Sequence, residues 1–359
     1  MLLVDFGQEP ELEDVMTKVA GHLPEDDIKA LCDCYGFYYR QNPKQLKVES
    51  SGSTGNPKSF EFNYQAVITS IENTARALNL NEGITAFLAL PLRYVAGRLM
   101  VLRAMHLKWK LYWARPSLKL SEIPIVEFAI CTPAQLSANP EMLDRIKALL
   151  VGGASVSHHL ERLVAERAKF SVFQSFAATE TLTNFALRRL APDYQEYYTA
   201  LPSVKIKSDQ SGKLWVYYPG ITRDFITTGD LVELLSDTSF KWIGRSDFVI
   251  NTGGLKVYPE KLEALLAESL GDRPFLITLV PDELLGQKIV LAIEAAAEKA
   301  IEKISQTFAQ LVSEKKLPKQ IIPKKVVFLK HFPTTKTGKP DRKKIQELVS
   351  TGHNKFIDL

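Results

Sequence analysis

Nine consecutive residues, SSGSTGNPK at positions 50–58, bring together the groups that proteins use to bind phosphate. Serine and threonine hydroxyls donate hydrogen bonds, glycines let backbone N–H groups surround an anion, and the closing lysine offsets negative charge. The P-loop of common nucleotide hydrolases is excluded, because Pro57 stands where that loop needs its second glycine and a strand pattern follows. A turn rich in Ser, Gly, Asn and Pro explains the composition equally well, so this stretch alone leaves both interpretations open.

Two short alternating runs flank this loop, LKVES before it and KSFEF after it, and both predict strands. Asn63 follows the second run and is typical of the residue that caps a helix N-terminus. Apolar residues at helical spacing continue behind it: Ile68, Ile71, Ala75 and Leu78. We therefore expect the loop to connect two strands, with a helix directly after the second one.

The next part of the chain alternates short apolar runs with segments of helical length. The strand-like runs are ITAFLALPL, EFAICT and KALLVGGA, and the helix-like segments are GRLMVLRAMH, PEMLDRIKALL and HHLERLVAERA. This alternation predicts an α/β fold in which helices pack on a sheet. From about Lys205 the expected strands become shorter and turn residues more frequent, as in VKIKSDQSGKLWVYY.

Beyond Gly244 a second compact segment mixes helices and strands. Its pattern predicts a helix at YPEKLEALLAESL, strands at PFLITLV and KIVLAIEAA, and a further helix built on apolar residues at 301, 304, 308 and 311. We place a domain boundary near Asp247, in the polar segment KWIGRSD. The expected organisation is a large α/β domain over residues 1–246, with sheets flanked by helices, and a smaller α+β domain over 247–359.

Composition and charge narrow the class of protein. Of 359 residues, 45% are hydrophobic and 24% are charged, which is typical of a globular protein long enough for two domains. The net charge of +4 is too small to indicate a nucleic-acid or membrane partner. The sequence shows neither a membrane-length apolar run nor a signal peptide. Three cysteines make no disulfide framework, so we expect a reduced cytoplasmic protein, with a homo-oligomer left open.

Four further stretches follow the first loop along the chain. They are SFAATETLT at 175–183, FITTGD ending at Asp230, GRSDFVINTGGLKVYPEKLE, and PTTKTGKPDRKK. Together with SSGSTGNPK they resemble the motifs of the adenylate-forming superfamily, which comprises acyl-CoA synthetases, peptide-synthetase adenylation domains and luciferases. Each stretch alone is a weak signal, but five in this order between Ser50 and Lys344 are a strong one.

The resemblance implies chemistry that makes a carboxylate reactive. A carboxylate is a poor electrophile because its charge repels nucleophiles and oxide cannot leave. Its reaction with ATP gives an acyl-adenylate, from which a thiol such as that of CoA can displace AMP. The first step brings two anions together, so the site must aim positive charge and hydrogen-bond donors at the α-phosphate. The implied cofactors and co-substrates are therefore ATP, Mg²⁺ and CoA.

The first two motifs imply the phosphate and adenine contacts. The β- and γ-phosphates would be held by four side chains of the first loop, with two glycines allowing close backbone approach: Ser51, Ser53, Thr54, Lys58, Gly52 and Gly55. Thr179 would contact the α-phosphate and Glu180 would bind Mg²⁺, since a hard carboxylate suits that ion. Phe176 would lie against adenine. The turn formed by Gly152, Gly153 and Ala154 would pass the adenine edge, and Ala177 stands where the family usually has glycine.

The later motifs imply the ribose and catalytic contacts. Asp230 only accepts hydrogen bonds when it is ionised, which suits the two hydroxyls of a ribose, and Arg245 would add a donor. Lys339 matches the family lysine that bridges the carboxylate and the α-phosphate. Its surroundings are rich in lysine, as solvated faces and nucleic-acid patches are, but they offer no interleaved aromatic platform suited to stacking bases. We therefore expect no nucleic-acid binding.

The resemblance also implies a mobile small domain. The second step needs room for a thiol where Lys339 stood, and the family provides it by rotating the small domain as a rigid body. Asp247 matches the hinge position. Rotation would withdraw Lys339 and bring in the NTGGLK loop, where Gly253 and Gly254 would let pantetheine pass close to the backbone.

The acid itself is the least determined part. The superfamily usually carries a further subdomain before the phosphate loop, whereas only about fifty residues precede it here. Short versions with runs like LPLRYVAGRLMVLRA look most like o-succinylbenzoate–CoA ligases of menaquinone biosynthesis. Tyr94, Gly97 and Arg98 are expected to line the acyl pocket. Arg98, with Arg93 and Arg188 as weaker candidates, could pair with a second carboxylate, although ordinary surface pairing explains these arginines as well.

The sequence thus favours an ATP- and Mg²⁺-dependent acid–CoA ligase, with o-succinylbenzoate as the best single substrate and a small-molecule carboxylate, ATP and CoA as its partners. Two alternatives stay open. One is an adenylate-forming ligase for another aryl or fatty acid, or for a carrier protein, although no carrier is fused here. The other is a non-catalytic nucleotide-binding homologue, which the presence of Lys339, Glu180 and Asp230 disfavours.

Overall fold

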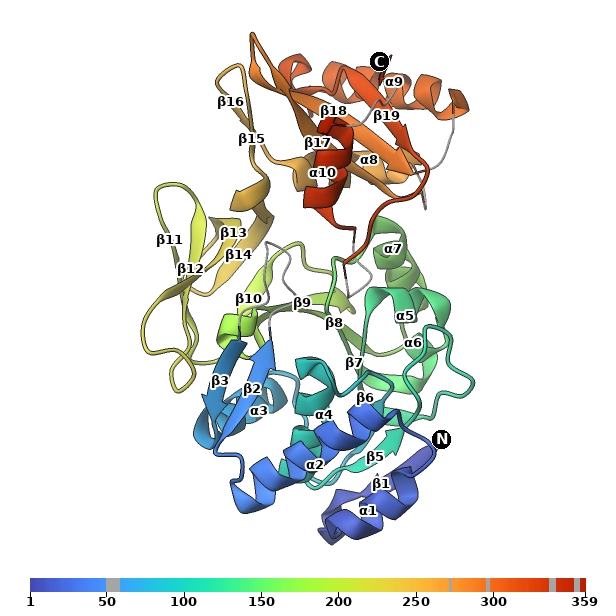
Figure 1. Cartoon of the computed structure of the whole chain (residues 1–359), viewed down its shortest axis with the longest axis vertical. Coiled ribbons are helices and arrows are strands. Elements are labelled where there is room, and N and C mark those ends of the chain that lie inside the picture. The colour runs from blue at the N-terminus through green and yellow to red at the C-terminus, as the bar shows by residue number, and fades with distance from the viewer. Residues whose placement is uncertain (50–58, 271–272, 295–297, 336–339, 352–355) are drawn as a thin grey trace.

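The computed structural model describes residues 1–49, 59–270, 273–294, 298–335, 340–351 and 356–359. Within these residues twelve strands form one mixed sheet in the order β1-β5-β4-β6-β7-β8-β9-β10-β14-β13-β12-β11 (Figure 1). Its strands are β1 Leu2–Asp5, β4 Thr85–Leu88, β5 Lys110–Trp113, β6 Val126–Cys131, β7 Ile146–Val151, β8 Ser171–Ala177, β9 Asn184–Ala191, β10 Tyr198–Ala200, β11 Lys205–Ser208, β12 Lys213–Tyr217, β13 Ile226–Leu234 and β14 Ser239–Arg245. The predicted α/β architecture is confirmed.

The helices that pack on this sheet come from the first 167 residues of the chain. They are α1 Leu12–Val19, α2 Glu25–Arg40, α3 Tyr64–Ala77, α4 Val95–His106, α5 Pro133–Ala138, α6 Met142–Arg145 and α7 His158–Arg167. The predictions of a helix at PEMLDRIKALL and a strand at KALLVGGA overlap at residues 147–150. The helix ends at Arg145, and the strand is confirmed there as β7. The β7 strand begins at the β-branched Ile146 and is buried at its apolar end, which favours a strand over a longer helix.

Five neighbouring strands, β5, β4, β6, β7 and β8, are parallel, so their carboxyl ends meet at one edge of the sheet. From β4 the chain moves outward to β5, whereas from β6 it moves the other way through β7 to β8. The direction therefore reverses between β4 and β6. Ligands of sheets of this kind bind outside the carboxyl ends at such a reversal.

Strand β6 shows why these strands lie in the interior. Phe128 and Ile130 pack in one core with residues of α3 and α4, whereas Ala129 and Cys131 pack in a second core with residues of α5 and α7. A strand buried on both faces needs a continuous apolar run rather than an alternating one. The stretch FAIC at 128–131 supplies such a run, and all four of its residues are buried.

The predicted strand pair around the first loop is present. Strands β2 (Gln45–Glu49) and β3 (Ser59–Asn63) pair antiparallel, with Glu49 opposite Ser59, and form a separate two-stranded sheet. The predicted N-cap is also confirmed, because the Asn63 side chain accepts a hydrogen bond of 2.9 Å from the Ala66 N–H at the start of α3.

The rest of the chain builds a second sheet above the first in Figure 1. Its order is β16-β15-β18-β19-β20, with β17 also pairing with β18. The elements are η3 Ser246–Phe248, β15 Ile250–Thr252, β16 Leu255–Val257, α8 Pro259–Leu270, β17 Phe275–Asp282, β18 Gly286–Glu294, α9 Glu298–Ser313, η4 Lys319–Ile321, β19 Lys325–Leu329, α10 Arg342–Thr351 and β20 Phe356–Asp358. Apolar side chains of α8 and α9 cover one face, and those of α10 cover the other.

In the part of the chain that the structure describes, none of the helices combines the length and apolar character needed to cross a lipid bilayer.

Candidate active site

Two groups of predicted site residues lie outside the described residues. They are the predicted phosphate-loop residues Ser51, Gly52, Ser53, Thr54, Gly55 and Lys58, and the predicted catalytic residue Lys339. The neighbouring residues are described: β2 and β3 bracket the loop, and Thr334 and Pro340 form an isolated β-bridge on either side of Lys339. In Figure 1 the segment that leaves β19 runs from the small sheet toward the carboxyl end of β8.

The predicted adenine-edge turn follows β7 at the carboxyl edge of the sheet. Gly152 donates a hydrogen bond of 2.9 Å from its backbone N–H to the Cys131 carbonyl at the end of β6. A Cβ at this position would collide with the Ser175 hydroxyl of β8, so a larger residue would force that side chain to turn away. Gly153 has a φ of +84°, which also favours glycine. Residues 152–154 therefore lie directly beside β8.

Phe176, the predicted adenine contact, lies near the end of β8 and is half-buried. Its ring makes edge contacts with three others, at centroid distances of 5.4 Å to Phe185, 4.8 Å to Tyr198 and 5.2 Å to Phe240. Such pairs hold an aromatic ring in a fixed orientation. Ala177 lies within β8 without a positive φ, so alanine fits where the family usually has glycine.

A buried polar network lies behind this aromatic cluster. Arg188 of β9 forms an ion pair of 2.6 Å with Glu161 of α7 and donates from Nε to the Gln174 carboxamide oxygen of β8 at 3.0 Å. The Tyr194 hydroxyl donates to the second Glu161 oxygen at 3.2 Å. The Arg188 guanidinium also lies over the Tyr198 ring, 5.5 Å from its centroid. Arg188 is therefore occupied by this network.

Thr179 and Glu180 form a short 3-10 helix, η2 Thr179–Thr181, immediately after β8. Both side chains are half-buried. The turn ends at Leu182, which has a φ of +64°, an uncommon conformation for a residue other than glycine. Within the described residues the Glu180 carboxylate has no hydrogen-bond or ion-pair partner, so it is available to a ligand at the carboxyl edge of the sheet.

Asp230 and Arg245 are direct cross-strand partners on β13 and β14. The Arg245 guanidinium lies 3.6 Å from the Asp230 carboxylate and donates to the Thr228 carbonyl at 2.6 Å. Trp242 donates its indole N–H to Asp230 at 3.1 Å. Burial raises the pKa of Asp230, and the nearby Arg245 charge partly offsets this. The structure thus brings the two predicted ribose contacts together.

Tyr94, Gly97 and Arg98 lie where β4 ends and α4 begins, next to the point where the strand direction reverses. Tyr94 is the N-cap residue of α4. A Cβ at Gly97 would collide with the Pro91 carbonyl, so this glycine allows the helix to pack closely on its own entry loop. Arg98 donates to the backbone carbonyls of Leu92, at 2.9 Å, and Lys47, at 3.1 Å.

A second arginine of α4, Arg103, was not among the residues singled out from the sequence. It is only 2% exposed, and its one hydrogen bond in the described residues runs from Nη2 to the Thr74 hydroxyl at 3.5 Å. Three buried polar atoms of this cluster have no hydrogen-bond partner among the described residues: Arg103 Nε, Ser70 Oγ and Asn184 Nδ2. Burial lowers the pKa of Arg103 to about 10, so its charge persists at neutral pH.

The contact between the two sheets lies close to the ribose residues. Glu260 of α8 faces Gly244 of β14, where a Cβ would lie 2.6 Å from the carboxylate oxygen Oε2. That oxygen is buried without a hydrogen-bond partner in the described part, and burial raises the pKa of Glu260. Asp247, the predicted hinge, lies in η3 and pairs with Arg245 at 3.1 Å.

Gly253 and Gly254 form the turn between β15 and β16, with φ values of +54° and +82°. Two successive residues with positive φ are typical of a tight hairpin turn, which explains the pair of glycines. In Figure 1 this hairpin points away from the large sheet, so the predicted CoA contacts and the ribose contacts lie apart in this arrangement.

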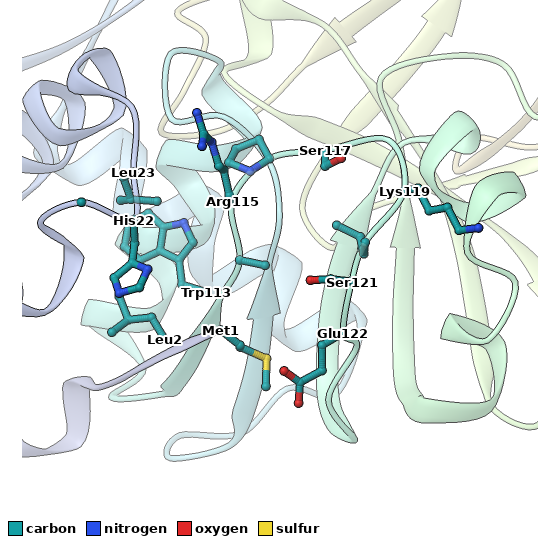
Figure 2. Close-up of a pocket in the computed structure, with 14 residues that line it drawn as sticks. Met1, Leu2, His22, Leu23, Trp113, Arg115, Ser117, Lys119, Ser121 and Glu122 are labelled. Atoms are coloured by element: carbon teal, nitrogen blue, oxygen red, sulfur yellow. The ribbon is translucent and has the colours of Figure 1, made fainter.

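A cavity of about 500 Å³ lies at the β1–β5 end of the large sheet, between β1, the α1–α2 loop and the segment after β5 (Figure 2). Figure 2 shows its ionic side chains diverging, with Lys119 pointing away from Arg115 and Glu122. The strand β5 is four inter-strand spacings from β8, or about 19 Å. This cavity is therefore separate from the candidate active site.

Comparisons with known proteins identify what the chain is similar to. No family model matches it. It is 24% identical to a 2-succinylbenzoate–CoA ligase of Geobacillus sp. (strain WCH70) over 92% of this chain and 73% of that protein. Among solved structures, an acyl-CoA synthetase (AMP-forming)/AMP-acid ligase II-like protein from Dyadobacter fermentans DSM 18053 is 29% identical, with 96% of this chain and 99% of that chain covered and a TM-score of 0.58.

The o-succinylbenzoate CoA synthetase of Bacillus subtilis, solved with the acyl-adenylate intermediate OSB-AMP, has the same fold. Its TM-score is 0.71 at 20% identity, over 84% of this chain and 68% of that chain. The Dyadobacter protein is thus about as long as this chain, whereas the Bacillus enzyme is longer.

Proposed function

We propose that this chain is a member of the adenylate-forming superfamily and acts as an AMP-forming acid–CoA ligase. The proposed reaction joins a carboxylate to the thiol of CoA through an acyl-adenylate, and it requires ATP and Mg²⁺. Similarity to 2-succinylbenzoate–CoA ligase makes o-succinylbenzoate the best single candidate for the acid. Because ATP and CoA are metabolites of the cytoplasm, the proposed activity also favours a cytoplasmic location.

One observation carries the choice of acid, namely the buried Arg103 guanidinium that has no carboxylate partner among the described residues. A buried charge is costly unless an opposite charge pairs with it. One carboxylate of o-succinylbenzoate reacts, and the other would pair with Arg103 through charge-assisted hydrogen bonds. We prefer Arg103 to Arg98 for this role, because two backbone carbonyls already accept hydrogen bonds from Arg98.

The position of Arg103 suits this role. It lies on α4, less than two helical turns after Gly97, and the neighbouring Asn184 lies four residues after Glu180. We propose that this cluster faces the acyl site, near the predicted metal and α-phosphate contacts. An acid held between them would present one carboxylate to ATP and the other to Arg103.

In the proposed first step, the substrate carboxylate attacks the α-phosphorus of ATP and pyrophosphate leaves. Lys339 would neutralise the two approaching anions, and Thr179 would donate a hydrogen bond to the α-phosphate. The loop 51–58 would hold the phosphates that leave. Asp230 would accept hydrogen bonds from the ribose hydroxyls, and Arg245 would donate to the same sugar.

Glu180 fits a magnesium site. Its half-buried carboxylate has no partner in the described residues and stands beside the predicted α-phosphate contact. Mg²⁺ commonly takes one or two protein carboxylates and completes its shell with water and phosphate oxygens, so a single protein ligand is consistent with this ion. When bound, it would neutralise charge that develops on the phosphates.

For the second step we propose that the chain divides between residues 246 and 247 and that the small domain turns about Asp247. The observed arrangement suits adenylation, because the segment leading to residue 336 approaches the large sheet while the Gly253–Gly254 turn points away (Figure 1). Rotation would withdraw Lys339 and bring the glycine turn to the pantetheine arm. The CoA thiolate would then attack the acyl carbon, and AMP would leave.

Pyrophosphate release tests this function. The purified chain is mixed with MgATP and o-succinylbenzoate, benzoate, short and long fatty acids or amino acids, each with and without CoA. We expect release with o-succinylbenzoate and a thioester only when CoA is present. Pyrophosphate release with a different acid would support the ligase activity and change the assigned substrate. No release with any acid, while ATP still binds, would indicate a non-catalytic homologue.

A split of the two half-reactions tests the assignment of Lys339. Lys339→Ala should slow adenylation by far more than it slows thioester formation from a supplied acyl-adenylate. The physical reason is that the bridging charge is needed only while two anions combine. An equal loss in both half-reactions would remove this role from Lys339.

A further inference from the structure

The network around Arg188 joins the two walls of the predicted adenine slot. One wall is the turn 152–154, which leads within four residues into α7, the helix that carries Glu161. The other wall is Phe176 at the end of β8, the strand that carries Gln174. Arg188 reaches Glu161 at 2.6 Å and Gln174 at 3.0 Å, so a single guanidinium connects both walls.

The same guanidinium also contacts the aromatic residues that hold Phe176. Arg188 lies over the Tyr198 ring, and that ring packs edge-on against Phe176 at 4.8 Å. Gln174 and Phe176 are two residues apart on one strand and therefore project from the same face. The orientation of Phe176 is thus coupled, through Tyr198 and Gln174, to the Arg188–Glu161 pair.

Stability alone does not explain this arrangement. The Arg188 and Glu161 side chains are 12% and 10% exposed, so both charges lose most of their hydration, and their mutual attraction must first offset that cost. Apolar residues of similar volume often hold a core equally well. A charged pair is the better choice where direction matters, because the forked guanidinium fixes the angle as well as the distance of its partners.

We propose that Arg188 and Glu161 are positioning residues for adenine: they set the separation of the turn 152–154 from Phe176 and thereby the selectivity for adenine nucleotides. This inference rests on the proposed function only in assuming that Phe176 lies against the base. Neither residue is expected to touch the reacting atoms.

Nucleotide binding tests the proposal independently of the ligase reaction. Affinities for AMP and GMP are measured by calorimetry for the whole chain, for Arg188→Met, and for the apolar double variant Arg188→Met/Glu161→Leu. Arg189→Met is the matched control, since Arg189 is the neighbouring residue of β9, is partly exposed, and lies 3.9 Å from its acidic partner in the described residues, Asp193. The melting temperature of each protein is recorded in parallel.

We expect Arg188→Met to weaken AMP binding at least tenfold and to reduce the preference for AMP over GMP, with the control unchanged. The double variant should regain the melting temperature of the original chain without regaining AMP affinity. Recovery of both together would show that the pair serves packing only and would overturn the proposal. If the chain binds AMP selectively but releases no pyrophosphate with any acid, the ligase fails while this inference stands.

Where the ligase is active, steady-state kinetics add a second readout. A positioning role predicts a higher KM for ATP in Arg188→Met with the KM for the acid within twofold of the original value. A general loss of structure would raise both KM values and lower kcat together. That pattern would count against adenine positioning.

Discussion

Replacing Arg103 by methionine should stabilise the protein and damage its function at the same time. The substitution keeps a long unbranched side chain of similar reach and removes a charge that is 2% exposed. It also removes Nε, a buried donor without a partner in the described residues. Both changes relieve costs that the folded protein bears when no anion is bound.

The size of the effect follows from the pKa. Burial lowers the pKa of Arg103 from 12.5 to about 10. This shift means that the folded protein destabilises the charged form, relative to the neutral form, by about 3 kcal/mol. Removing the charge should recover part of this, so we expect the free energy of unfolding to rise by about 1–3 kcal/mol. The substitution removes only a long hydrogen bond of 3.5 Å from Arg103 to the Thr74 hydroxyl. That hydroxyl keeps its hydrogen bonds to the Ser70 carbonyl and the Asn184 side chain.

The functional loss should be confined to the dicarboxylate. Removing one partner of a buried, hydrogen-bonded charge pair costs about 2–5 kcal/mol of binding, or roughly 30-fold to several-thousand-fold in kcat/KM. We therefore expect kcat/KM for o-succinylbenzoate to fall by at least 30-fold, while the KM for ATP is unchanged. Arg40→Met, at the exposed end of α2, is the control for loss of an arginine that has no ligand role.

Urea unfolding and pyrophosphate release, measured on the same preparations, decide the outcome. A large loss of stability with unchanged kinetics would show that Arg103 has a purely structural role and that the inferred second carboxylate has no partner here. A loss of ATP affinity equal to the loss for the acid would also refute the reasoning, because it would show that the whole site is disturbed.

Three further predictions follow from individual contacts. Gly97→Ala should destabilise the protein by about 1–3 kcal/mol in urea unfolding despite the better helix propensity of alanine, because its Cβ would meet the fixed Pro91 carbonyl. Since burial raises the pKa of Asp230, the KM for ATP should begin to rise at a pH above the ordinary aspartate value as pH falls, and Asp230→Asn should lose this dependence in a pH series. The pKa of Glu260 is raised in the folded protein, chiefly by burial. Its protonated form therefore contributes to stability below the unfolded-state pKa, and this contribution is lost as pH rises through the folded-state pKa. Glu260→Gln should therefore raise the melting temperature at neutral pH, and this increase should become smaller in acid. A lower melting temperature at neutral pH would show instead that the carboxylate stabilises the protein.

Local features of the fold were predictable because they depend on neighbouring residues. The Asn63 cap needs only its own side chain and an N–H three residues on, and the strands on either side of the first loop need only alternating residues. The order of the strands was not predictable, because it depends on which helices cover which face. The helix predicted at PEMLDRIKALL ends before Ile146 for the same reason, because burial between β6 and β8 favours a strand there.

The candidate site shows the same division. The motifs identified Asp230 and Arg245 by type, and the structure makes them cross-strand partners. The Glu161–Arg188 pair joins two residues that are 27 positions apart, one on a helix and one on a strand, so no local sequence pattern could predict it. Loop residues 51–58 and Lys339 lie outside the described residues, so their roles stay predictions from the motifs alone.

Arg103, in contrast, had a signal in the sequence. The segment GRLMVLRAMH is apolar on every side of a helix, apart from its arginines and the final histidine. A helix of this kind is buried all round, so an arginine in its middle lies away from bulk water, unlike Arg98 in the first turn. A buried charge in turn requires a partner, and none is present in the described residues. Natural sequences break such local rules mainly at functional sites, so the residue that fits α4 least well is the one most informative about the substrate.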